Sequence, residues 1–574
     1  MSAVEPLLEV QDLTVRFGSN VVVDRISFTL AEGECLGLVG ASGSGKSVTS
    51  LALMRLLDQR SSVITGSIRY AGRNILDLDE DEFRPLRGKE FAMVFQEPMT
   101  ALDPVYTVGE QVGESLRLHM GMERKAARER TIELFQEVLL PDPKEIHDRY
   151  PHQLSGGQKQ RVVIAMALSC SPRILICDEP TTALDVLVQR EVIDLLKRIQ
   201  KERSMAMIFI THDLGVVREI ADRALVMYKG KVVENAPVIE LFDRPQHPYT
   251  KGLIACRPDP TRHPKRLPTI DEVMERAAVG TDLPIETISS EARRQHVEEM
   301  LGTPPLLRVS GLEKSFTGQH GTISRTTSVT KVLHDISFNV HPGETLGIVG
   351  GSGSGKTTLG RTILRLIEPG AGHILYHAKG SEAAVDLAHL DSDRMRRMRR
   401  ELQIIFQDPY SSLNPRLTIG AAITEAMRVH GLRDNDDQRR SHVKELLEQV
   451  GLEAAHFDRF PHQFSGGQRQ RIVIARAIAL EPRLIICDES VAALDVSVQA
   501  QVLNLLNELK EDHGLTYIFI SHDLAVVKYF CDRILVLERG RNVELGPADQ
   551  VYDRPAAGYT KQLIAAIPGQ ARDR

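Results

Sequence analysis

The sequence has no run of 18 consecutive apolar residues, which is the length that a membrane-spanning helix needs. Its longest apolar stretches, such as VVIAMAL and AMIFI, have the length of core elements. The N-terminal MSAVEPLLEVQDL carries two acidic residues and no basic region, so we expect no signal peptide. The net charge of −6 gives no reason to expect nucleic acid as the main partner.

Cysteine is also scarce. None of the six cysteines forms a CxxC pair, and their scattered spacing favours buried apolar thiols in a reducing compartment. A metal or disulfide framework is the less favoured alternative. The six are Cys35, Cys170, Cys177, Cys256, Cys487 and Cys531.

What the chain does contain is a long internal repeat. At 574 residues it is too long for one hydrophobic core. The segment PHQLSGGQKQR from Pro151 recurs as PHQFSGGQRQR from Pro461, 310 positions later. GASGSGKS and GGSGSGKT are related by the same offset. A period of this length indicates a duplicated domain and excludes a solenoid of short repeats.

We place the first copy at residues 1–256 and the second at 306–574. The 49 residues between them, 257–305, are rich in proline and mixed in charge, which predicts a flexible linker with one short helix. The segment that begins at Phe316 is twelve residues longer than its counterpart at Phe17. Its polar, glycine-containing composition predicts an enlarged surface hairpin.

Each copy has the pattern of an α/β domain. Alternating β-rich segments come first, and the buried strand CLGLVG then leads into a glycine-rich loop and a helix. A helix-rich middle, roughly residues 105–170, precedes the apolar strands RILICDE and AMIFI, which are separated by a helix. Strands that alternate with helices predict a parallel sheet covered on both faces.

The two glycine-rich loops fit the phosphate-loop pattern G-x-x-x-x-G-K-[ST] in the context that supports it, after a strand and before a helix. Backbone N–H groups and the helix N-terminus suit phosphate oxygens. Lys46 and Lys356 can reach the β- and γ-phosphates, and Ser47 and Thr357 can hold Mg²⁺. The predicted nucleotide-binding residues here are Gly40, Ser42, Gly43, Ser44, Gly45, Lys46, Ser47, Gly350, Ser352, Gly353, Ser354, Gly355, Lys356 and Thr357.

Acids and histidines stand at predicted strand ends, where ligands bind in such sheets. We expect Asp178 and Asp488 to hold Mg²⁺, directly or through water, and Glu179 and Glu489 to orient and polarise the attacking water. His212 and His522 can reach the γ-phosphate if their strand neighbours the acidic one. Gln96 and Gln407 could contact Mg²⁺ or the water, or be ordinary polar strand-end residues. The predicted metal ligands are Ser47, Gln96, Asp178, Thr357, Gln407 and Asp488.

In these residues the chain resembles the ATP-binding cassette (ABC) family. Walker A, Q-loop, SGGQ signature, Walker B, D-loop (TALD, AALD) and H-loop occur twice, in family order. The resemblance implies two tandem P-loop ATPase domains, each with a mainly parallel core, an antiparallel β subdomain and a helical subdomain. It implies stacking of adenine on Phe17 and Phe316, which spacing alone could equally assign to the core.

The resemblance also implies head-to-tail ATP sites, because the signature offers a hydroxyl and N–H groups but lacks what the phosphate loop supplies. Each signature then closes over the ATP of the other copy. The predicted signature residues are Ser155, Gly156, Gly157, Gln158, Ser465, Gly466, Gly467 and Gln468.

More finely, FQEPMTALDPVYTVGEQV and RPQHPYTKGLIA are similar to the oligopeptide and dipeptide importer branch. That resemblance implies two transmembrane permease subunits, an extracytoplasmic solute-binding protein and a peripheral position on the cytoplasmic face of the inner membrane. Segments 97–110 and 408–420 are the expected permease contacts. Only Cys256 lies after HPYT, so we expect no iron–sulfur cluster.

Two departures from the family pattern are Phe464 in place of the usual leucine, and Ser490 in DES. Both are peripheral to the phosphate chemistry, so two competent sites are expected. A ribosome-acting double cassette is an alternative, but its connector would be basic and strongly helical. A DNA-repair cassette would need long insertions. The transported solute is left open: a peptide, glutathione, nickel or another cargo.

Overall fold

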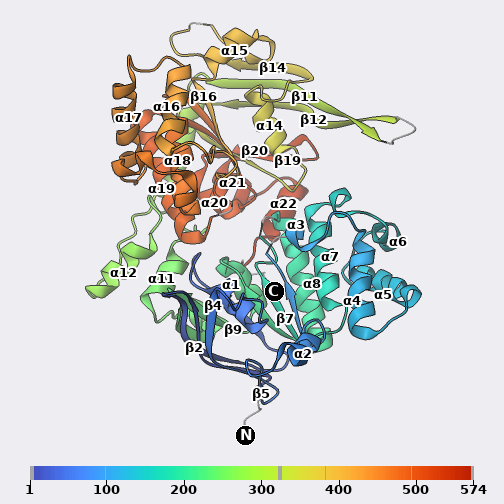
Figure 1. Ribbon diagram of the computed structural model, residues 1–574. Helices are drawn as coiled ribbons and strands as arrows, with labels where there is room; N and C mark the ends of the chain where they lie inside the picture. Colours follow the sequence, from blue (N-terminus) through green and yellow to red (C-terminus); the bar gives the residue numbers. More distant parts are fainter. Residues whose placement is uncertain are drawn as a thin grey trace.

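Both halves of the chain carry the same pair of sheets, one mainly parallel and one antiparallel (Figure 1). The structure is a computed structural model that describes residues 6–96, 98–182, 184–320, 326–381, 383–492 and 494–569. In the first half the six-stranded sheet has the order β10-β9-β3-β8-β7-β6, and the four-stranded sheet has the order β2-β1-β4-β5. The strands are β1 (Leu8–Phe17), β2 (Asn20–Leu30), β3 (Cys35–Val39), β4 (Ser62–Tyr70), β5 (Arg73–Asn74), β6 (Phe91–Val94), β7 (Ile174–Asp178), β8 (Ala206–Ile210), β9 (Arg223–Tyr228) and β10 (Lys231–Pro237).

The second half repeats this topology as β16-β17-β18-β13-β19-β20 and β12-β11-β14-β15. Its edge strand β20 is antiparallel to β19, like β10 to β9 in the first half. The strands are β11 (Leu307–His320), β12 (Thr326–Val340), β13 (Thr345–Val349), β14 (Ala371–Tyr376), β15 (Val385–Asp386), β16 (Leu402–Ile405), β17 (Leu484–Asp488), β18 (Thr516–Ile520), β19 (Arg533–Glu538) and β20 (Arg541–Pro547).

Helices flank the parallel sheets and form a helical region in each half. In the first half they are α1 (Lys46–Leu53), α2 (Glu80–Phe83), η1 (Arg84–Leu86), α3 (Pro98–Ala101), α4 (Val108–Met120), α5 (Arg124–Glu137), α6 (Pro143–His147), η2 (Pro151–Gln153), α7 (Gly156–Leu168), α8 (Val186–Arg203), α9 (Leu214–Ile220), α10 (Val238–Asp243) and α11 (Pro248–Ala255). Two lie between the halves, α12 (Ile270–Ala278) and α13 (Ser290–Leu301). In the second half they are α14 (Lys356–Ile363), η3 (Leu387–His389), α15 (Ser392–Met398), α16 (Ile419–Val429), α17 (Asp436–Gln449), η4 (Ala454–Asp458), η5 (Pro461–Gln463), α18 (Gly466–Ile478), α19 (Val496–His513), α20 (Leu524–Phe530), α21 (Ala548–Asp553) and α22 (Gly558–Ala565). None of the helices in the described ranges is long and apolar enough to cross a membrane.

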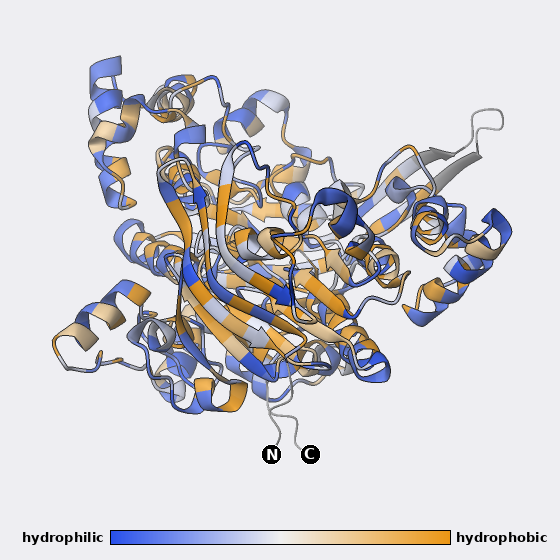
Figure 2. Cartoon of the chain, turned by 60° about the horizontal axis from the view of Figure 1, so that its bottom comes forward, coloured by the Kyte–Doolittle hydropathy of each residue, from blue (hydrophilic) through white to orange (hydrophobic). Residues whose placement is uncertain are grey.

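The central strands are apolar along their whole length because both faces of the sheet are covered. Every residue of β3, β7 and β8 is buried. In Figure 2 the central strands are largely apolar, whereas the outlying helices carry both apolar and polar residues. Strand β8 pairs in parallel with β7, so the residues that follow the two strands emerge at one edge. This confirms the neighbouring placement that the histidine prediction required.

The hairpin predicted from the twelve-residue insertion is present. Strands β11 and β12 pair beyond Phe316 as far as the His320–Thr326 pair, whereas in the first half Phe17 already faces Asn20 at the turn. The longer hairpin projects from the second half in Figure 1. The insertion is therefore a surface extension of the two-strand pattern that both halves share.

The segment between the halves is a correction to the sequence prediction, which expected a flexible linker with one short helix. It contains the two helices α12 and α13, and several of its side chains are buried; α12 packs on α11 of the first half, where Ile270 lies against Gly252. The apolar core of the second half is continuous with Leu267 and Ile270 of the linker and with Leu253 of the first half. The proline-rich composition thus accompanies a docked segment and not a flexible one.

One buried amide fixes the linker to α19. Oδ1 of Asn504 accepts a hydrogen bond from Leu267 N at 2.9 Å, and its Nδ2 donates to Leu267 O at 2.8 Å. The position 310 residues earlier, on α8, is Asp194, whose side chain is 52% exposed. An ionised carboxylate has no donor and could satisfy only the N–H of such a partner. The two halves therefore differ at the residue that holds the linker.

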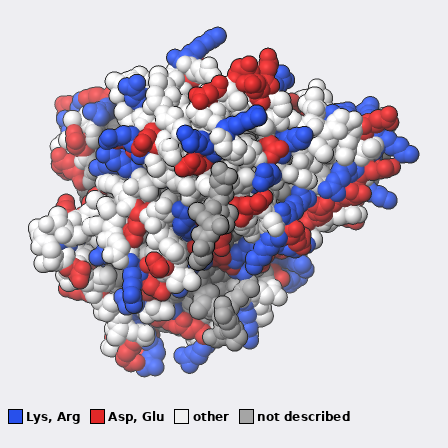
Figure 3. Space-filling model, turned by 90° about the horizontal axis from the view of Figure 1, so that it is seen from below, with Lys and Arg blue, Asp and Glu red and all other residues white. Residues whose placement is uncertain are grey.

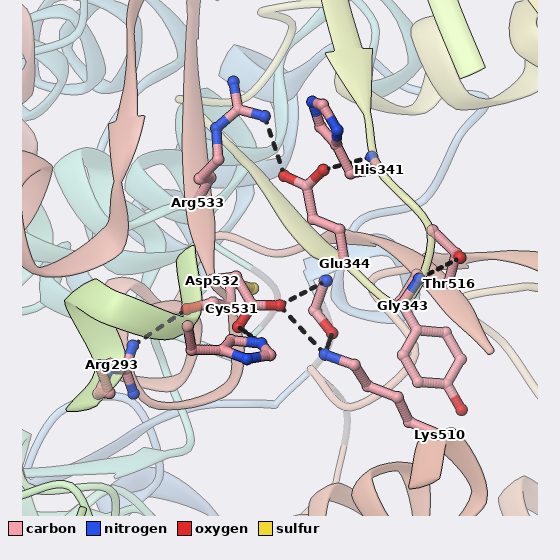
Figure 4. A network of polar contacts seen from close by, with 12 residues as sticks. Arg293, His341, Gly343, Glu344, Lys510, Thr516, Cys531, Asp532 and Arg533 are labelled. Carbon is pink, nitrogen blue, oxygen red and sulfur yellow. Dashed lines mark hydrogen bonds and ion pairs between the residues drawn. The ribbon is translucent and has the colours of Figure 1, made fainter. Parts of the chain in front are cut away.

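A second anchor lies at the end of α20 (Figure 4). The Arg293 guanidinium of α13 donates hydrogen bonds at 3.1 Å to the carbonyls of Lys528 in the last turn of α20 and of its C-cap residue Cys531. Carbonyls at a helix C-terminus lack partners within the helix. Next to Cys531, Asp532 accepts from Lys510 at 3.1 Å. Arginine at a helix C-terminus also complements the helix dipole.

We predict that Asn504→Ala detaches the linker locally. The substitution leaves a buried N–H and C=O of Leu267 without partners, at a cost of about 1–3 kcal/mol. Trypsin cleavage at Lys265 and Arg266 should accelerate about tenfold, measured by mass spectrometry of the native chain. Asp194→Ala, the same position in the first half, is the matched control and should leave the cleavage rate unchanged. Equal rates for Asn504→Ala and the unmodified chain would contradict the anchor.

Candidate functional site: two sets of phosphate-binding residues

Each phosphate loop connects a buried strand to a helix, β3 to α1 and β13 to α14. The N-cap residue Gly45 has φ 102°, a left-handed conformation that glycine adopts without strain. At Gly40 a Cβ would lie 2.3 Å from the Met227 carbonyl oxygen, and at Gly350 only 2.2 Å from that of Leu537. Side chains are therefore excluded where the loop turns against the neighbouring strand.

The loop lysines lie inside their loops. Lys46 Nζ donates to the carbonyls of Gly40 at 2.8 Å and Ala41 at 3.0 Å, and burial lowers its pKa. Lys356 Nζ donates to Gly350 at 2.8 Å in the same way. When ATP binds, phosphate oxygens can replace these carbonyls as the acceptors of the lysine hydrogen bonds.

Of the three metal ligands predicted in each half, the structure brings together the hydroxyl and the aspartate, whereas Gln96 and Gln407 donate to the neighbouring glutamates. Ser47 Oγ lies 3.2 Å from Asp178 Oδ1, and Thr357 Oγ1 lies 2.9 Å from Asp488 Oδ1. Both aspartates are buried, which raises the pKa of each carboxyl. A hydroxyl and a carboxylate at a strand end form a hard oxygen set, so these residues fit Mg²⁺.

The predicted catalytic groups of the first half meet at Glu179. Gln96 Nε2 lies 3.0 Å and His212 Nδ1 lies 3.3 Å from Oε2 of Glu179. Burial raises the pKa of Glu179, but the hydrogen bond and charge of His212 outweigh it and bring the pKa to about 2. The glutamate has φ 48°, and a strained backbone of this kind is common at functional sites.

The second half repeats this cluster with one difference. Gln407 Nε2 lies 2.9 Å and His522 Nδ1 lies 3.6 Å from Oε2 of Glu489. In the first half the Thr182 hydroxyl also donates to Glu179 at 2.8 Å. The position 310 residues later is Ala492, which has no hydroxyl. The two glutamates are therefore not held identically, and the sequence analysis did not identify Thr182.

The signature segments begin helices α7 and α18. Ser155 is an N-cap whose Oγ accepts from Gln158 N, while Gln158 Oε1 accepts from Ser155 N at 3.0 Å, and Ser465 and Gln468 do the same. Around Gly156 and Gly466 there is open space for a Cβ, whereas at Gly157 a Cβ would lie 2.6 Å from Val188. One glycine of each pair thus serves packing, and the other leaves the helix N-terminus open to a ligand.

The two aromatic residues predicted to stack on adenine differ in exposure. Phe17 is half-buried against the core of the first half. Phe316 is 42% exposed, with Lys314 Nζ 5.1 Å from its ring centre. An exposed aromatic ring can serve as a stacking surface for a base.

The halves contact one another through aspartates that the sequence analysis did not include among the site residues. Asp495 Oδ2 accepts from Ser42 N in the phosphate loop of the first half at 3.4 Å. Asp185 Oδ2 accepts from Ser352 N in the second loop at 3.0 Å. Each aspartate is also the N-cap of the helix that follows it, α19 or α8. The sequence feature that could have identified Asp185 and Asp495 is their position as the last residue of the TALD and AALD segments.

The sequence analysis also missed two tyrosines of the HPYT and AGYT segments. The buried Tyr249 hydroxyl accepts from Ala41 N at 2.8 Å, and the Tyr559 hydroxyl accepts from Gly351 N at 2.8 Å. Burial raises the pKa of Tyr249 to about 12. Each tyrosine holds the phosphate loop of its own half from a segment 208 residues away.

Together these groups define a P-loop nucleotide-hydrolysing protein with two sites. Family comparisons agree: the ABC transporter model matches residues 23–182 and 333–492, and the model of the C-terminal region of oligopeptide/dipeptide transporters matches residues 233–279 and 543–574. The chain belongs to the ABC transporter family. It is an ATPase of that family.

Its relatives include the glutathione import ATP-binding protein GsiA of Escherichia coli, 46% identical over 98% of this chain and 89% of the relative. The protein of the same name from Pectobacterium atrosepticum is 45% identical with the same coverage. Among solved structures, CbiO1 of Clostridium perfringens, part of the ABC transporter complex CbiONQ, is 26% identical over 44% of this chain and 92% of that chain, with a TM-score of 0.37.

We predict that Tyr249→Phe with Tyr559→Phe weakens ATP binding without removing catalytic groups. Each change leaves one loop N–H without its acceptor, which costs about 1–3 kcal/mol when the group is buried. The KM for ATP should rise about tenfold while kcat changes less than twofold, measured by steady-state hydrolysis. Tyr228→Phe, a ring neighbour of Tyr249 at 4.3 Å with no bond to the loop, is the control. A fall in kcat at unchanged KM would contradict the positioning role.

Proposed function

We propose that the chain is the energy-coupling ATPase of an importer of peptides or peptide-like solutes such as glutathione. The relatives are named glutathione import proteins, and the oligopeptide/dipeptide transporter region is matched twice. The observation that carries the proposal is the reciprocal contact of each phosphate loop with an aspartate of the other half. One chain thereby supplies two facing ATP sites.

The proposed chemistry assigns a task to each residue. Lys46 binds the phosphates, and Ser47 with Asp178 holds Mg²⁺, which neutralises phosphate charge when bound. Glu179 orients and polarises the attacking water, because its low pKa keeps it ionised at neutral pH. His212 and Gln96 hold the glutamate and can contact the γ-phosphate. The same tasks in the second half are assigned to Lys356, Thr357, Asp488, Glu489, His522 and Gln407.

Composite sites are the second part of the proposal. Gly467 of the second signature lies against Val498, with only 2.4 Å between a Cβ at Gly467 and Val498 Cγ1. Val498 N donates to Asp495, and Asp495 accepts from Ser42 of the first phosphate loop. This series of contacts supports the pairing of Ser465–Gln468 with the Lys46 site, and by the repeat of Ser155–Gln158 with the Lys356 site.

We further propose that the helical region of each half binds one of two permease subunits. Val105 and Tyr106 within the predicted segment 97–110, and Phe95 just before it, are exposed apolar side chains. Residue 97 lies outside the described residues. A pocket lined by Glu110, Arg117 and Arg124, among others, adjoins this segment. In 408–420 the ring of Tyr410 is 54% exposed. Apolar exposure of this kind is typical of protein contacts.

The remaining parts of the proposal are an extracytoplasmic binding protein, a peripheral position at the inner membrane, and no iron–sulfur cluster. Cys256 is buried, and a cluster needs several thiolates. We propose no nucleic-acid partner, because the face in Figure 3 interleaves acidic and basic side chains without a continuous basic patch. This face therefore offers no basic surface that would favour the alternative of a ribosome-acting double cassette.

Co-purification tests the function. The tagged chain, extracted with detergent from its native membrane, should retain two permease subunits, and Glu110→Arg should reduce their recovery at least fivefold while basal ATP hydrolysis persists. Glu110 pairs with Arg124 at 2.9 Å in the pocket, so reversal changes the charge of the contact surface. Glu133→Arg, an exposed acid elsewhere on the helical region, is the control. Co-sedimentation with ribosomes instead would overturn the assignment.

Disulfide crosslinking tests the composite sites. In a variant without native cysteines, Ser42→Cys should crosslink to Gly466→Cys when MgATP is bound, because the first phosphate loop faces the second signature. The yield is measured as the gel shift of an internally crosslinked chain. The pair Ser42→Cys with Gly156→Cys is the same-half control and should give little product. Preferential crosslinking of the control pair would contradict the head-to-tail arrangement.

A further inference from the structure

Outside the ATP sites, two histidines and an aspartate converge in the antiparallel sheet of the second half. His373 lies on β14, Asp386 ends β15, and His389 ends η3. The Nδ1 atoms of His373 and His389 lie 2.7 and 2.8 Å from the same oxygen, Asp386 Oδ2, and the two rings are 5.4 Å apart between centres. β14 lies in the upper part of Figure 1, at the outer side of the second half.

The carboxylate is fixed by the backbone and points one oxygen at the histidines. Asp386 Oδ1 accepts from Ile374 N at 3.0 Å and from Ala388 N at 3.1 Å. Its side chain is 23% exposed, whereas those of the two histidines are more than 60% exposed. A rigid carboxylate with two adjustable imidazoles leaves an open side towards solvent.

The first half shows which part of this arrangement the fold requires. Asn74 stands where Asp386 stands, and its Oδ1 accepts from Ile68 N at 3.0 Å and Leu76 N at 3.4 Å. Its Nδ2 donates to Asp77, which corresponds to His389. The strand register places Ser67 at the position of His373. The backbone contacts are common to both halves, so the fold needs only an acceptor oxygen here.

What differs is the set of possible metal ligands. In the second half the amide nitrogen becomes a carboxylate oxygen, and serine and aspartate become histidines. We propose that His373, Asp386 and His389 form a surface site for a late first-row divalent cation such as Zn²⁺ or Ni²⁺. Two imidazoles and one carboxylate are a ligand set that these ions prefer and that Mg²⁺ does not.

The geometry suits three protein ligands with positions left for water. The ligand atoms of the three residues lie within 4.8 Å of one another. Metal–ligand bonds of about 2.0–2.2 Å require shifts of some tenths of an ångström, which the exposed rings can make by rotation. The backbone bonds to Oδ1 orient the carboxylate, as supporting contacts do at other metal sites.

Zn²⁺ titration of the full chain tests the proposal. Calorimetry is carried out on EDTA-treated, dialysed protein with excess Mg²⁺ to occupy the phosphate-loop sites. The unmodified chain should bind one equivalent of Zn²⁺. The triple variant His373→Ser, Asp386→Asn, His389→Asp carries the residues of the first half, and its Kd should rise at least 10–100-fold. His119→Ala, which removes an exposed histidine of the first half, should leave binding unchanged.

The reciprocal exchange provides a gain-of-function test. Ser67→His, Asn74→Asp and Asp77→His should add a second Zn²⁺ equivalent to the unmodified chain. Zinc-edge X-ray absorption of the unmodified chain, which needs no variant, should show scattering from two imidazoles. Equal Zn²⁺ affinity of the triple variant and the unmodified chain, or a spectrum without imidazole scattering, would overturn the site. ATP hydrolysis by the triple variant should be unchanged.

Discussion

The reciprocal hydrogen bonds between phosphate loops and the Asp185 and Asp495 side chains are the contacts on which the ATP sites depend. Each aspartate uses one oxygen to cap its own helix and the other to accept from a loop amide of the opposite half. The cap fixes the direction of the side chain, so the inter-half bond needs little further ordering. Because Gly467 packs against Val498 and Val498 N donates to Asp495, the loop contact supports the proposed pairing of each signature with the ATP of the other half.

The two halves share a framework but have diverged around it. The strand-end acids, loop lysines and capping serines recur at matching positions. Thr182 supports its glutamate, and its counterpart Ala492 cannot. Asn504 holds the linker, whereas Asp194 is half exposed and pairs with Arg190 of its own helix. These differences leave the phosphate-binding geometry intact, which indicates that the core motifs tolerate divergence in the residues next to them.

Sequence reasoning predicted the α/β sheets and the strand-end clusters because their determinants are local. A buried strand followed by a glycine-rich loop, or by an acidic pair, needs few neighbours in sequence to be interpreted. It missed Tyr249 and Asp495 as site residues because their partners lie 208 and 453 residues away, and a local motif such as AALD does not identify the partner. It misjudged the linker because proline-rich composition does not reveal that one amide on α19 can bind Leu267 on both sides.

The docked linker has a consequence for the energetics of ATP-driven closure. The segment between the halves is anchored on both of them, because Ile270 of α12 packs against Gly252 of α11 in the first half, whereas Leu267 and Arg293 bond to the second half. A tether of this kind gives an effective concentration on the order of millimolar for the two ATP-binding faces. Pairing of the faces is then a unimolecular event that is independent of how much of the protein the cell contains. A weak affinity between faces suffices for closure and still permits them to separate after each hydrolysis.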